Sequence, residues 1–393
     1  MKKIGALLLA GLMAVSLAGC GSGSGEKEAE HTASVSGTSQ GETADSGERV
    51  TVGEDEIIQV GFITYSLTDS LNTTCLRAFD MFSADLGFEV STELFASVED
   101  IDTCAQNLLQ NGCQVIVSIT PSIPLLDLCE EYNAYLTIWG NTISDPEMAE
   151  YFAKSPYYAG CDSVSDWDAA TNAMQTLYDN GCRNLGIITQ STLNTNHSIR
   201  LNAINDFVEN HEDMKIVAQV GCDSNTSDVS AGVQNMIALY GEMDGLIATT
   251  VGSGWGDAIV STLEAEGKAG EIHFAGIDWT EAAADWLDKG YLDDIEAGQF
   301  PDLMFNVINA CNVARGAYEG NRQLEGRFVS IKGADGYADY IKYFDSEGVY
   351  PYSLEQLQSV CYYNNPEATY EELYDLWAGY SFEGIIEYWS NRE

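Results

Sequence analysis

The segment "IIQVGFITYSLTDSLNTTCLRAFDMFSADLGFEVSTELF" (residues 57–95) decides the fold. Its first seven residues form a short apolar run that predicts a buried strand. Residues 72–87 show helical spacing, with Asn72 as a possible N-cap and Gly87 as the stop. Residues 88–95 predict a second strand. A strand, a helix and a strand in this order predict a parallel sheet covered by helices.

The same alternation continues through residue 278. Further helices are expected at residues 97–112, 124–133, 163–181, 198–211, 229–241 and 256–267, and further strands at residues 114–119, 135–139, 184–189, 215–221, 244–251 and 272–278. These elements fall into two consecutive sets of about 100–120 residues each, which predicts two α/β domains. The expected fold class is therefore α/β, with two doubly wound parallel-sheet domains.

The N-terminus is expected to be processed. Lys2 and Lys3 precede a short apolar run that ends in "LAGC" at Leu17–Cys20, so residues 1–19 predict a secretory signal peptide. The "LAGC" resembles the lipobox of bacterial lipoproteins, which implies that Cys20 carries a lipid anchor in a membrane; in a generic signal peptide Cys20 would be incidental. Residues 20–56 are rich in Gly, Ser, Thr and Glu and predict a flexible tether.

Composition excludes several classes of function. The formal net charge is −44, and nucleic-acid binding needs clustered Lys and Arg, so no nucleic-acid partner is expected. The chain has ten cysteines and no C-x-x-C; with Cys20 assigned to lipid an odd number remains, which favours buried free thiols over disulfides. Four histidines without H-E-x-x-H predict no metal site, and no cofactor is expected.

An enzyme is not expected either. The G-x-S-x-G pattern of hydrolases occurs as "GTSQG" at residues 37–41, within the predicted tether. In hydrolases this pattern forms a turn between a strand and a helix, and neither is predicted there.

Seven segments, taken together and in order, resemble the type I periplasmic-binding-protein family, which contains the solute receptors of sugar transporters and the sensor domains of LacI-type repressors. The segments are "VGFI" (60–63), "NGCQVIVSITPS" (111–122), "YYAGCD" (157–162), "IRLNAINDF" (199–207), "DGLIATT" (244–250), "FAGIDW" (274–279) and "IEAGQFP" (295–301). The resemblance implies an N-terminal lobe of residues 57–161 and 300–330, a C-terminal lobe of residues 162–299, and a hinge between them. Residues 331–393 form a C-terminal extension.

Ligand is expected in the cleft between the lobes, where loops leave the carboxyl ends of the strands. The candidate ligand-binding residues in these loops are Tyr65, Ser66, Asp69, Asn72, Trp139, Asn141, Arg200, Ser253, Trp255, Asp278 and Gln299. The resemblance implies that Arg200 reaches ligand oxygens, that Asp278 accepts hydrogen bonds from hydroxyls, and that Gln299 contacts ligand from the hinge. Gly252 and Ser253 stand where sugar-binding members usually carry Asn-Asp.

Several candidates have structural alternatives. Trp139 can belong to the core and Arg200 to a helix surface, while Asp278 can cap the following helix. Gln299 can serve only to hold the crossover, and Trp255 can pack the start of its helix.

The extension is rich in aromatic residues. Thr369 and Glu372 predict a capping box at the start of a helix whose one face carries Tyr370, Leu373, Tyr374 and Trp377. Two interpretations stay open for this region: an extra helical layer packed on the domains, or a surface that binds a partner or lines the cleft.

The resemblance implies a lipid-anchored extracytoplasmic solute-binding protein, active as a monomer. It would bind a small polar solute, a sugar or polyol, by closing the cleft, and deliver it to the permease of an ABC importer. The alternative is a ligand-sensing receptor of the same fold, for a nucleoside or signalling molecule, coupled to a membrane kinase.

Overall fold

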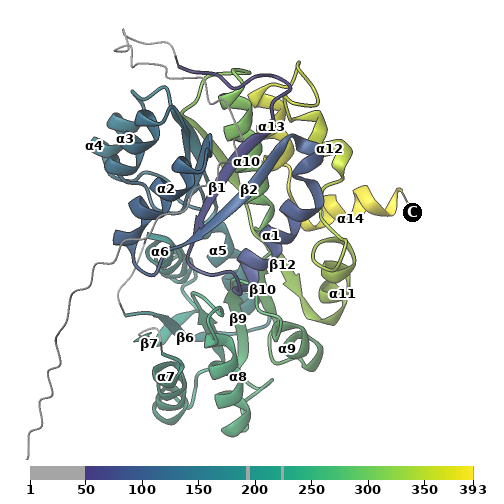
Figure 1. The fold of residues 1–393 in the computed structure, drawn as a ribbon. Coiled ribbons are helices and arrows are strands. Elements are labelled where there is room, and N and C mark those ends of the chain that lie inside the picture. Colours follow the sequence, from purple (N-terminus) through teal and green to yellow (C-terminus); the bar gives the residue numbers. More distant parts are fainter. Residues whose placement is uncertain (1–48, 192–194, 223–224, 393) are drawn as a thin grey trace, which may run out of the picture. The chain divides into compact units, whose positions relative to one another are not determined.

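The computed structural model describes residues 49–191, 195–222 and 225–392, and two six-stranded sheets form its framework (Figure 1). Cys20, the signal peptide and most of the predicted tether lie outside these residues. Residues 47–393 form one unit, so both sheets and the space between them belong to the same body.

Sheet A has the strand order β11-β5-β4-β3-β1-β2, and every neighbouring pair is parallel. Its strands are β1 (Ile58–Thr64), β2 (Phe88–Leu94), β3 (Val115–Ser118), β4 (Tyr135–Ile138), β5 (Tyr158–Val164) and β11 (Arg322–Gly326). Its helices are α1 (Ser70–Phe82), η1 (Ala84–Leu86), η2 (Val98–Asp100), α2 (Ile101–Gln110), α3 (Ile123–Glu131), α4 (Pro146–Phe152) and α10 (Pro301–Ala314). One buried cluster lies between the sheet and α2 and α3, and α1 and α10 cover the other face.

Sheet B has the order β12-β10-β9-β8-β6-β7, and only its edge strand β12 runs antiparallel. Its strands are β6 (Asn184–Gln190), β7 (Lys215–Cys222), β8 (Gly245–Ala248), β9 (His273–Ile277), β10 (Asp294–Ala297) and β12 (Val329–Lys332). Its helices are α5 (Asp166–Asp179), α6 (Thr195–Glu209), α7 (Thr226–Leu239), α8 (Trp255–Ala265) and α9 (Ala283–Lys289). Helices α5 and α6 cover one face, and α7 and α8 cover the other. The expectation of two parallel-sheet domains is confirmed.

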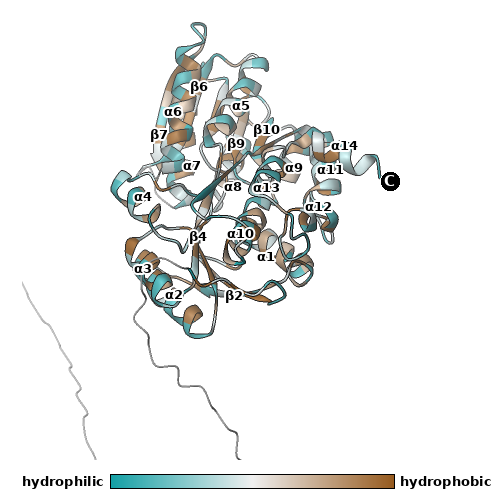
Figure 2. Ribbon diagram, turned by 90° about the horizontal axis from the view of Figure 1, so that it is seen from above, coloured by the Kyte–Doolittle hydropathy of each residue, from teal (hydrophilic) through white to brown (hydrophobic). Residues whose placement is uncertain are grey.

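The inner strands, such as β3, β4, β8 and β10, are buried on both faces, as a sheet covered by helices on each side requires, whereas the edge strands are partly exposed. Figure 2 shows this as apolar strands inside helices that are hydrophilic on their outer sides. The chain passes from sheet A to sheet B after β5, returns after β10, and crosses again between β11 and β12. These connections hold the carboxyl ends of both sets of parallel strands near each other.

The structure corrects two local expectations about the ends of α1. Helix α1 begins earlier than expected: its N-cap is Asp69, whose carboxylate accepts from the amides of Leu71 and Asn72, so the expected Asn72 cap is wrong. Asn72 lies inside the helix and is buried. Helix α1 also ends earlier than expected, at Phe82, and Gly87 instead ends the short 3-10 helix η1, with a left-handed φ of 74° that suits glycine.

The C-terminal extension packs as a helical layer and contacts both lobes. It contains α11 (Gly333–Tyr343), α12 (Leu354–Ser359), α13 (Tyr370–Ala378) and α14 (Phe382–Ser390). Helix α11 contacts α9 and β12 of the sheet B lobe, whereas α13 contacts β11 and α10 of the sheet A lobe. The expected capping box of Thr369 and Glu372 is confirmed.

A cluster of aromatic side chains fixes the extension. The ring of Trp377 is fully buried and stacks on Phe305 of α10 at 5.2 Å between centroids. Tyr380 packs against Trp377 and donates a hydrogen bond to the carbonyl of Gly298, in the crossover after β10, at 2.6 Å. The extension is therefore tied to the segment that joins the lobes.

The cysteines between Cys75 and Cys361 are all buried, and none forms a disulfide with another described residue. The expectation of buried thiols without disulfides is confirmed for this part of the chain. No helix within the described ranges is both long enough and apolar enough to cross a membrane.

Strand β10 carries two buried carboxyl groups, Asp294 and Glu296, and Glu296 should make folding stability depend on pH. Burial, with a smaller contribution from Asp294, raises the pKa of Glu296 to about 8. In the folded state this group holds its proton at pH values where the unfolded chain has released it. Its contribution to stability is therefore full below a pH of about 4.5 and is lost as pH rises toward about 8.

We expect Glu296→Gln to be more stable than the unmodified chain at pH 8 and to show a smaller loss of stability between pH 5 and pH 8. Urea unfolding across this range, monitored by tryptophan fluorescence, measures the effect. The matched control is Glu209→Gln, because Glu209 is exposed at the end of α6. An identical pH dependence in Glu296→Gln and in the unmodified chain would contradict this assignment.

Candidate functional site

A cleft lies where the carboxyl ends of the two sheets face each other. It consists of two adjoining cavities that share Tyr65, Leu71, Asp278 and Gln299 as walls. The inner chamber, about 400 Å³, is also lined by residues that follow β4, by the start of α6 and by Phe328. The second chamber, about 220 Å³, is lined by the start of α1, the loops after β8 and β9, and residues of the extension. Loops from both lobes thus enclose one continuous site.

A buried ion-pair network forms the floor of the inner chamber on the sheet B side. Arg200 donates from Nε to Asp166 at 2.6 Å and forms a bidentate pair with Asp278, at 2.9 Å from Nη1 and 3.2 Å from Nη2. Its Nη1 also donates to the carbonyl of Thr249 at 2.7 Å. The side chain of Arg200 is 5% exposed and that of Asp278 is 27% exposed. The guanidinium therefore holds Asp278 in place. Of the two groups, the carboxylate is the one that is exposed to the cleft.

The charges of this network are stable near neutral pH. Burial alone would raise the pKa of Asp278, but Arg200 outweighs it and holds the pKa below its usual value. Burial lowers the pKa of His197 to about 4, and Arg200 adds to this effect. His197 is therefore neutral at pH 7, and its Nδ1 lies 2.8 Å from the hydroxyl of Thr249.

The buried acids of the sheet A lobe behave differently. Burial raises the pKa of Asp302 to about 7, which leaves this carboxyl partly protonated at neutral pH. Asp302 lines the inner chamber, and the nearby Asp162 accepts hydrogen bonds from the amide of Gly140 and the side chain of Asn306. A protonated carboxyl can donate as well as accept, so this wall can serve either role toward a ligand.

Two cleft residues have strained backbones. Asp278 and Ser253 adopt positive φ angles of 74° and 52°, which are rare for residues other than glycine. Both follow strands of sheet B and line the second chamber. Strain of this kind often accompanies sites where function requires a particular side-chain position. Asp278 does not cap the following helix, because the N-cap of α9 is Ala282.

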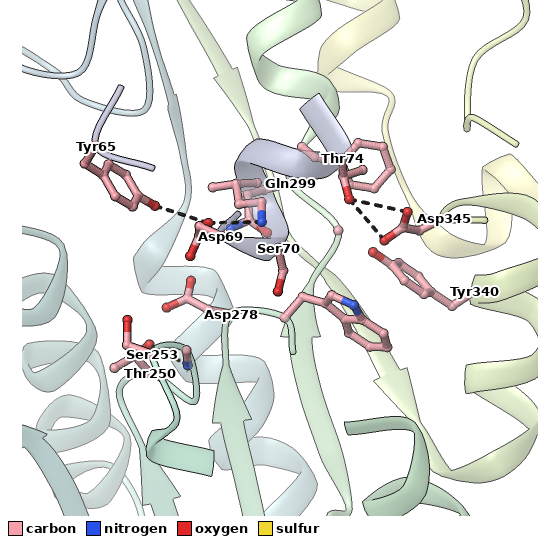
Figure 3. Close-up of a pocket in the computed structure, with 15 residues that line it drawn as sticks. Tyr65, Asp69, Ser70, Thr74, Thr250, Ser253, Asp278, Gln299, Tyr340 and Asp345 are labelled. Atoms are coloured by element: carbon pink, nitrogen blue, oxygen red, sulfur yellow. Dashed lines mark hydrogen bonds between the residues drawn. The ribbon is translucent and has the colours of Figure 1, made fainter. Parts of the chain in front are cut away.

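The structure brings most of the sequence candidates together in the cleft. Those that line one or both chambers are Tyr65, Asp69, Trp139, Asn141, Arg200, Ser253, Asp278 and Gln299. Tyr65 is 47% exposed and donates to Asp69 at 3.3 Å (Figure 3). Arg200 is a buried cleft residue rather than a helix-surface residue.

Three candidates lie outside the chamber walls. The hydroxyl of Ser66 accepts from the amides of Thr68 and Asp69 and shapes the turn before α1. Asn72 is buried beneath that turn and accepts from the hydroxyl of Thr64 at 2.8 Å. Trp255 is 2% exposed and packs in the core at the start of α8, which matches its structural alternative.

Sequence reasoning missed several residues of the cleft wall: His197, Ser70, Thr250, Trp279, Tyr340 and Asp345. Trp279 directly follows Asp278, so its place after β9 was a usable signal. Tyr340 and Asp345 belong to the extension and gave no such signal, because they reach the cleft only through tertiary packing. Among the described residues, no group of three or more His, Cys, Asp or Glu is placed to hold a metal ion.

Removing Arg200 should destabilise the fold strongly. In Arg200→Ala the buried Asp166 and Asp278 lose their partner, and breaking a buried pair costs about 3–5 kcal/mol in the free energy of unfolding. Arg183→Ala is the matched control, because Arg183 pairs with Asp213 near the surface, where such a pair contributes about 0–1 kcal/mol. Urea unfolding of both variants at pH 7 measures the difference. Equal losses would contradict a structural role for the buried network.

Comparison with protein families supports this architecture. Residues 134–314 match a model described as a periplasmic binding protein domain. This is a family of binding proteins, in line with the expectation that the chain is not an enzyme. No curated protein matches the chain.

Solved structures with the same fold are numerous, although their sequences differ widely from this one. An ABC transporter periplasmic solute-binding protein from Actinobacillus succinogenes 130z, with bound D-allose, has a TM-score of 0.62 and 14% identity, covering 72% of this chain and 99% of its own. A solute-binding protein from Bacillus halodurans C-125, with bound myo-inositol, has a TM-score of 0.61 and 16% identity, covering 74% and 100%. One from Agrobacterium vitis, with bound D-fucose, has a TM-score of 0.60 and 11% identity, covering 74% and 99%.

At these identities the likeness concerns the fold, and the family match adds the evidence from sequence. Residues 134–314 therefore match the model of a periplasmic binding protein domain, and the two-lobed fold around them is similar to that of solute-binding proteins of ABC transporters.

Proposed function

We propose that this protein is an extracytoplasmic solute-binding protein that captures a neutral, hydroxyl-rich solute, a sugar or polyol, and delivers it to an ABC importer. The observation that carries the proposal is the bidentate pair of Arg200 and Asp278 at the meeting point of the two lobes. The pair fixes a carboxylate acceptor in a cleft with an aromatic wall. Hydroxyl groups that donate to such an acceptor form charge-assisted hydrogen bonds.

The chemistry of the cleft supports this class of solute over an anion. Arg200 is the cationic side chain that lines the inner chamber, and its guanidinium is already occupied by Asp166, Asp278 and Thr249. No described Lys or Arg lines the second chamber. An anionic ligand would meet carboxylates without a free counter-charge, whereas a sugar offers hydroxyl donors to the lone pairs of Asp278 that Arg200 leaves unused.

Capture would depend on movement of the lobes. Gln299 lies in the crossover after β10 and lines both chambers, so a ligand held there contacts the segment that must bend when the lobes close. Hydrogen bonds formed in the closed cleft are shielded from water, which strengthens them. No bond of the solute would be made or broken.

The proposal includes a lipid anchor at Cys20, the residue that would become the N-terminus after removal of residues 1–19. The sequence of the "LAGC" segment supports it. Mass spectrometry of the protein purified from membranes would detect the acyl chains, and Cys20→Ala should release the protein from the membrane fraction.

A ligand screen tests the solute class. Monosaccharides, disaccharides, cyclic polyols, nucleosides and amino acids would be compared by thermal shift. A true ligand at a concentration about 100 times its Kd should stabilise the fold by about 2.7 kcal/mol and raise Tm by several degrees. The absence of a shift with every sugar and polyol, together with a shift for another class, would overturn the proposed solute class.

Asp278→Asn tests the place of binding. This change preserves the shape of the side chain and removes the charge that the solute hydroxyls would meet. We expect affinity for the identified solute to fall at least tenfold, about 1.4 kcal/mol, in isothermal titration calorimetry. The matched control is Asp285→Asn on α9, an exposed acid of the same lobe that pairs with Lys289. Unchanged affinity in Asp278→Asn would contradict binding at this carboxylate.

A further inference from the structure

The cleft extends through two joined chambers, of about 400 Å³ and 220 Å³. The inner chamber and the second chamber share a boundary formed by Tyr65, Asp278 and Gln299, which line both. This boundary is called the collar below. The ligands in the similar structures described above, D-allose, myo-inositol and D-fucose, are each a single ring or a single monosaccharide. A second cavity joined to the first therefore needs an explanation of its own.

The extension builds the outer wall of the second chamber. Tyr340 and Asp345 line it, and both lie beyond residue 314, where the family match ends. Asp345 pairs with Arg77 of α1. Its carboxylate also lies 3.5 Å from the hydroxyl of Thr74 (Figure 3), so the wall is fastened to the sheet A lobe. This region of the cleft is thus formed by a part of the chain outside the matched domain.

An aromatic surface is fixed in this chamber. The indole of Trp279 lies 4.7 Å from the ring of Tyr340 and stacks on Tyr337 at 6.2 Å, with 11° between their planes. Both tyrosines belong to α11 of the extension, which keeps the indole from rotating freely. A rigid aromatic side chain offers a large apolar face at little cost in conformational entropy, and the C–H face of a sugar ring can pack against it.

Hydroxyl and carboxylate groups complete the chamber. Ser70 and Asp278 point into the space between the lobes, and Ser253 and Thr250 lie beside it (Figure 3). The side-chain amide of Gln299 has no hydrogen-bond partner among the described residues, although it borders both chambers. An aromatic face opposite a set of polar groups suits a ring that carries hydroxyls on its rim.

We propose that the solute has two linked rings, as in a neutral disaccharide or glycoside, with one ring in the inner chamber and the other against Trp279 in the second chamber. The linkage would pass the collar, where the free amide of Gln299 can contact both rings. The inference rests on the proposed function and makes it more specific. It assigns Trp279 and the extension residue Tyr340 to selection of the second ring.

Calorimetric titration with a panel of neutral disaccharides and their component monosaccharides tests the proposal. One disaccharide should bind at least tenfold more tightly than either of its components. Trp279→Ala should weaken that disaccharide by about tenfold or more and leave the affinity for the inner-chamber monosaccharide within about twofold. The matched control is Trp167→Ala, which removes a 42%-exposed indole outside both chambers and should change neither affinity.

A second variant keeps the test decisive if Trp279→Ala folds poorly. Ser70→Tyr places a bulky ring in the second chamber and should abolish the preference for the disaccharide while monosaccharide binding remains. A monosaccharide that binds as tightly as every disaccharide containing it would overturn the two-ring proposal and leave the proposed function standing. Equal losses of both affinities in Trp279→Ala would also overturn it. If no sugar of either kind binds, the proposed function itself fails.

Discussion

The structure depends on one geometric constraint: parallel strands of a sheet all end at the same edge. Each sheet therefore gathers the loops that leave its carboxyl ends, and the crossovers after β5 and β10 turn those two edges toward each other. Residues that are more than 200 positions apart, such as Tyr65 and Asp278, become walls of one cavity as a result. The site is a consequence of the topology before any particular side chain is considered.

Arg200 links several of the elements that meet at this edge of sheet B. Its guanidinium joins α5 through Asp166, the end of β8 through the Thr249 carbonyl, and the end of β9 through Asp278. The same contacts that satisfy a buried charge also fix the carboxylate at the cleft surface. Stability and the proposed recognition therefore depend on the same hydrogen bonds, and we expect a substitution at Arg200 to affect both.

The sequence predicted the fold well because its signals are local and repeated. Apolar runs such as residues 57–63 alternate with helical spacing, and the order of elements is enough to imply parallel sheets. Candidates chosen as residues that follow strands, such as Asp278 and Trp139, do line the cleft. Asn72 and Trp255 were misplaced as wall residues because the turn before α1 and the start of α8 direct them into the interior, which spacing alone does not reveal.

The contribution of the extension could not be predicted because it depends on long-range packing. Tyr340 reaches the second chamber because Trp377 and Tyr380 anchor the extension on α10 and on the Gly298 carbonyl. That anchor lies on the segment that would bend during closure. The sequence left two interpretations of the extension open, and each describes part of it. The extension is a packed helical layer, and one edge of that layer forms part of the cleft wall. A change in the packing of Trp377 would accordingly alter both the stability of the extension and the shape of the second chamber.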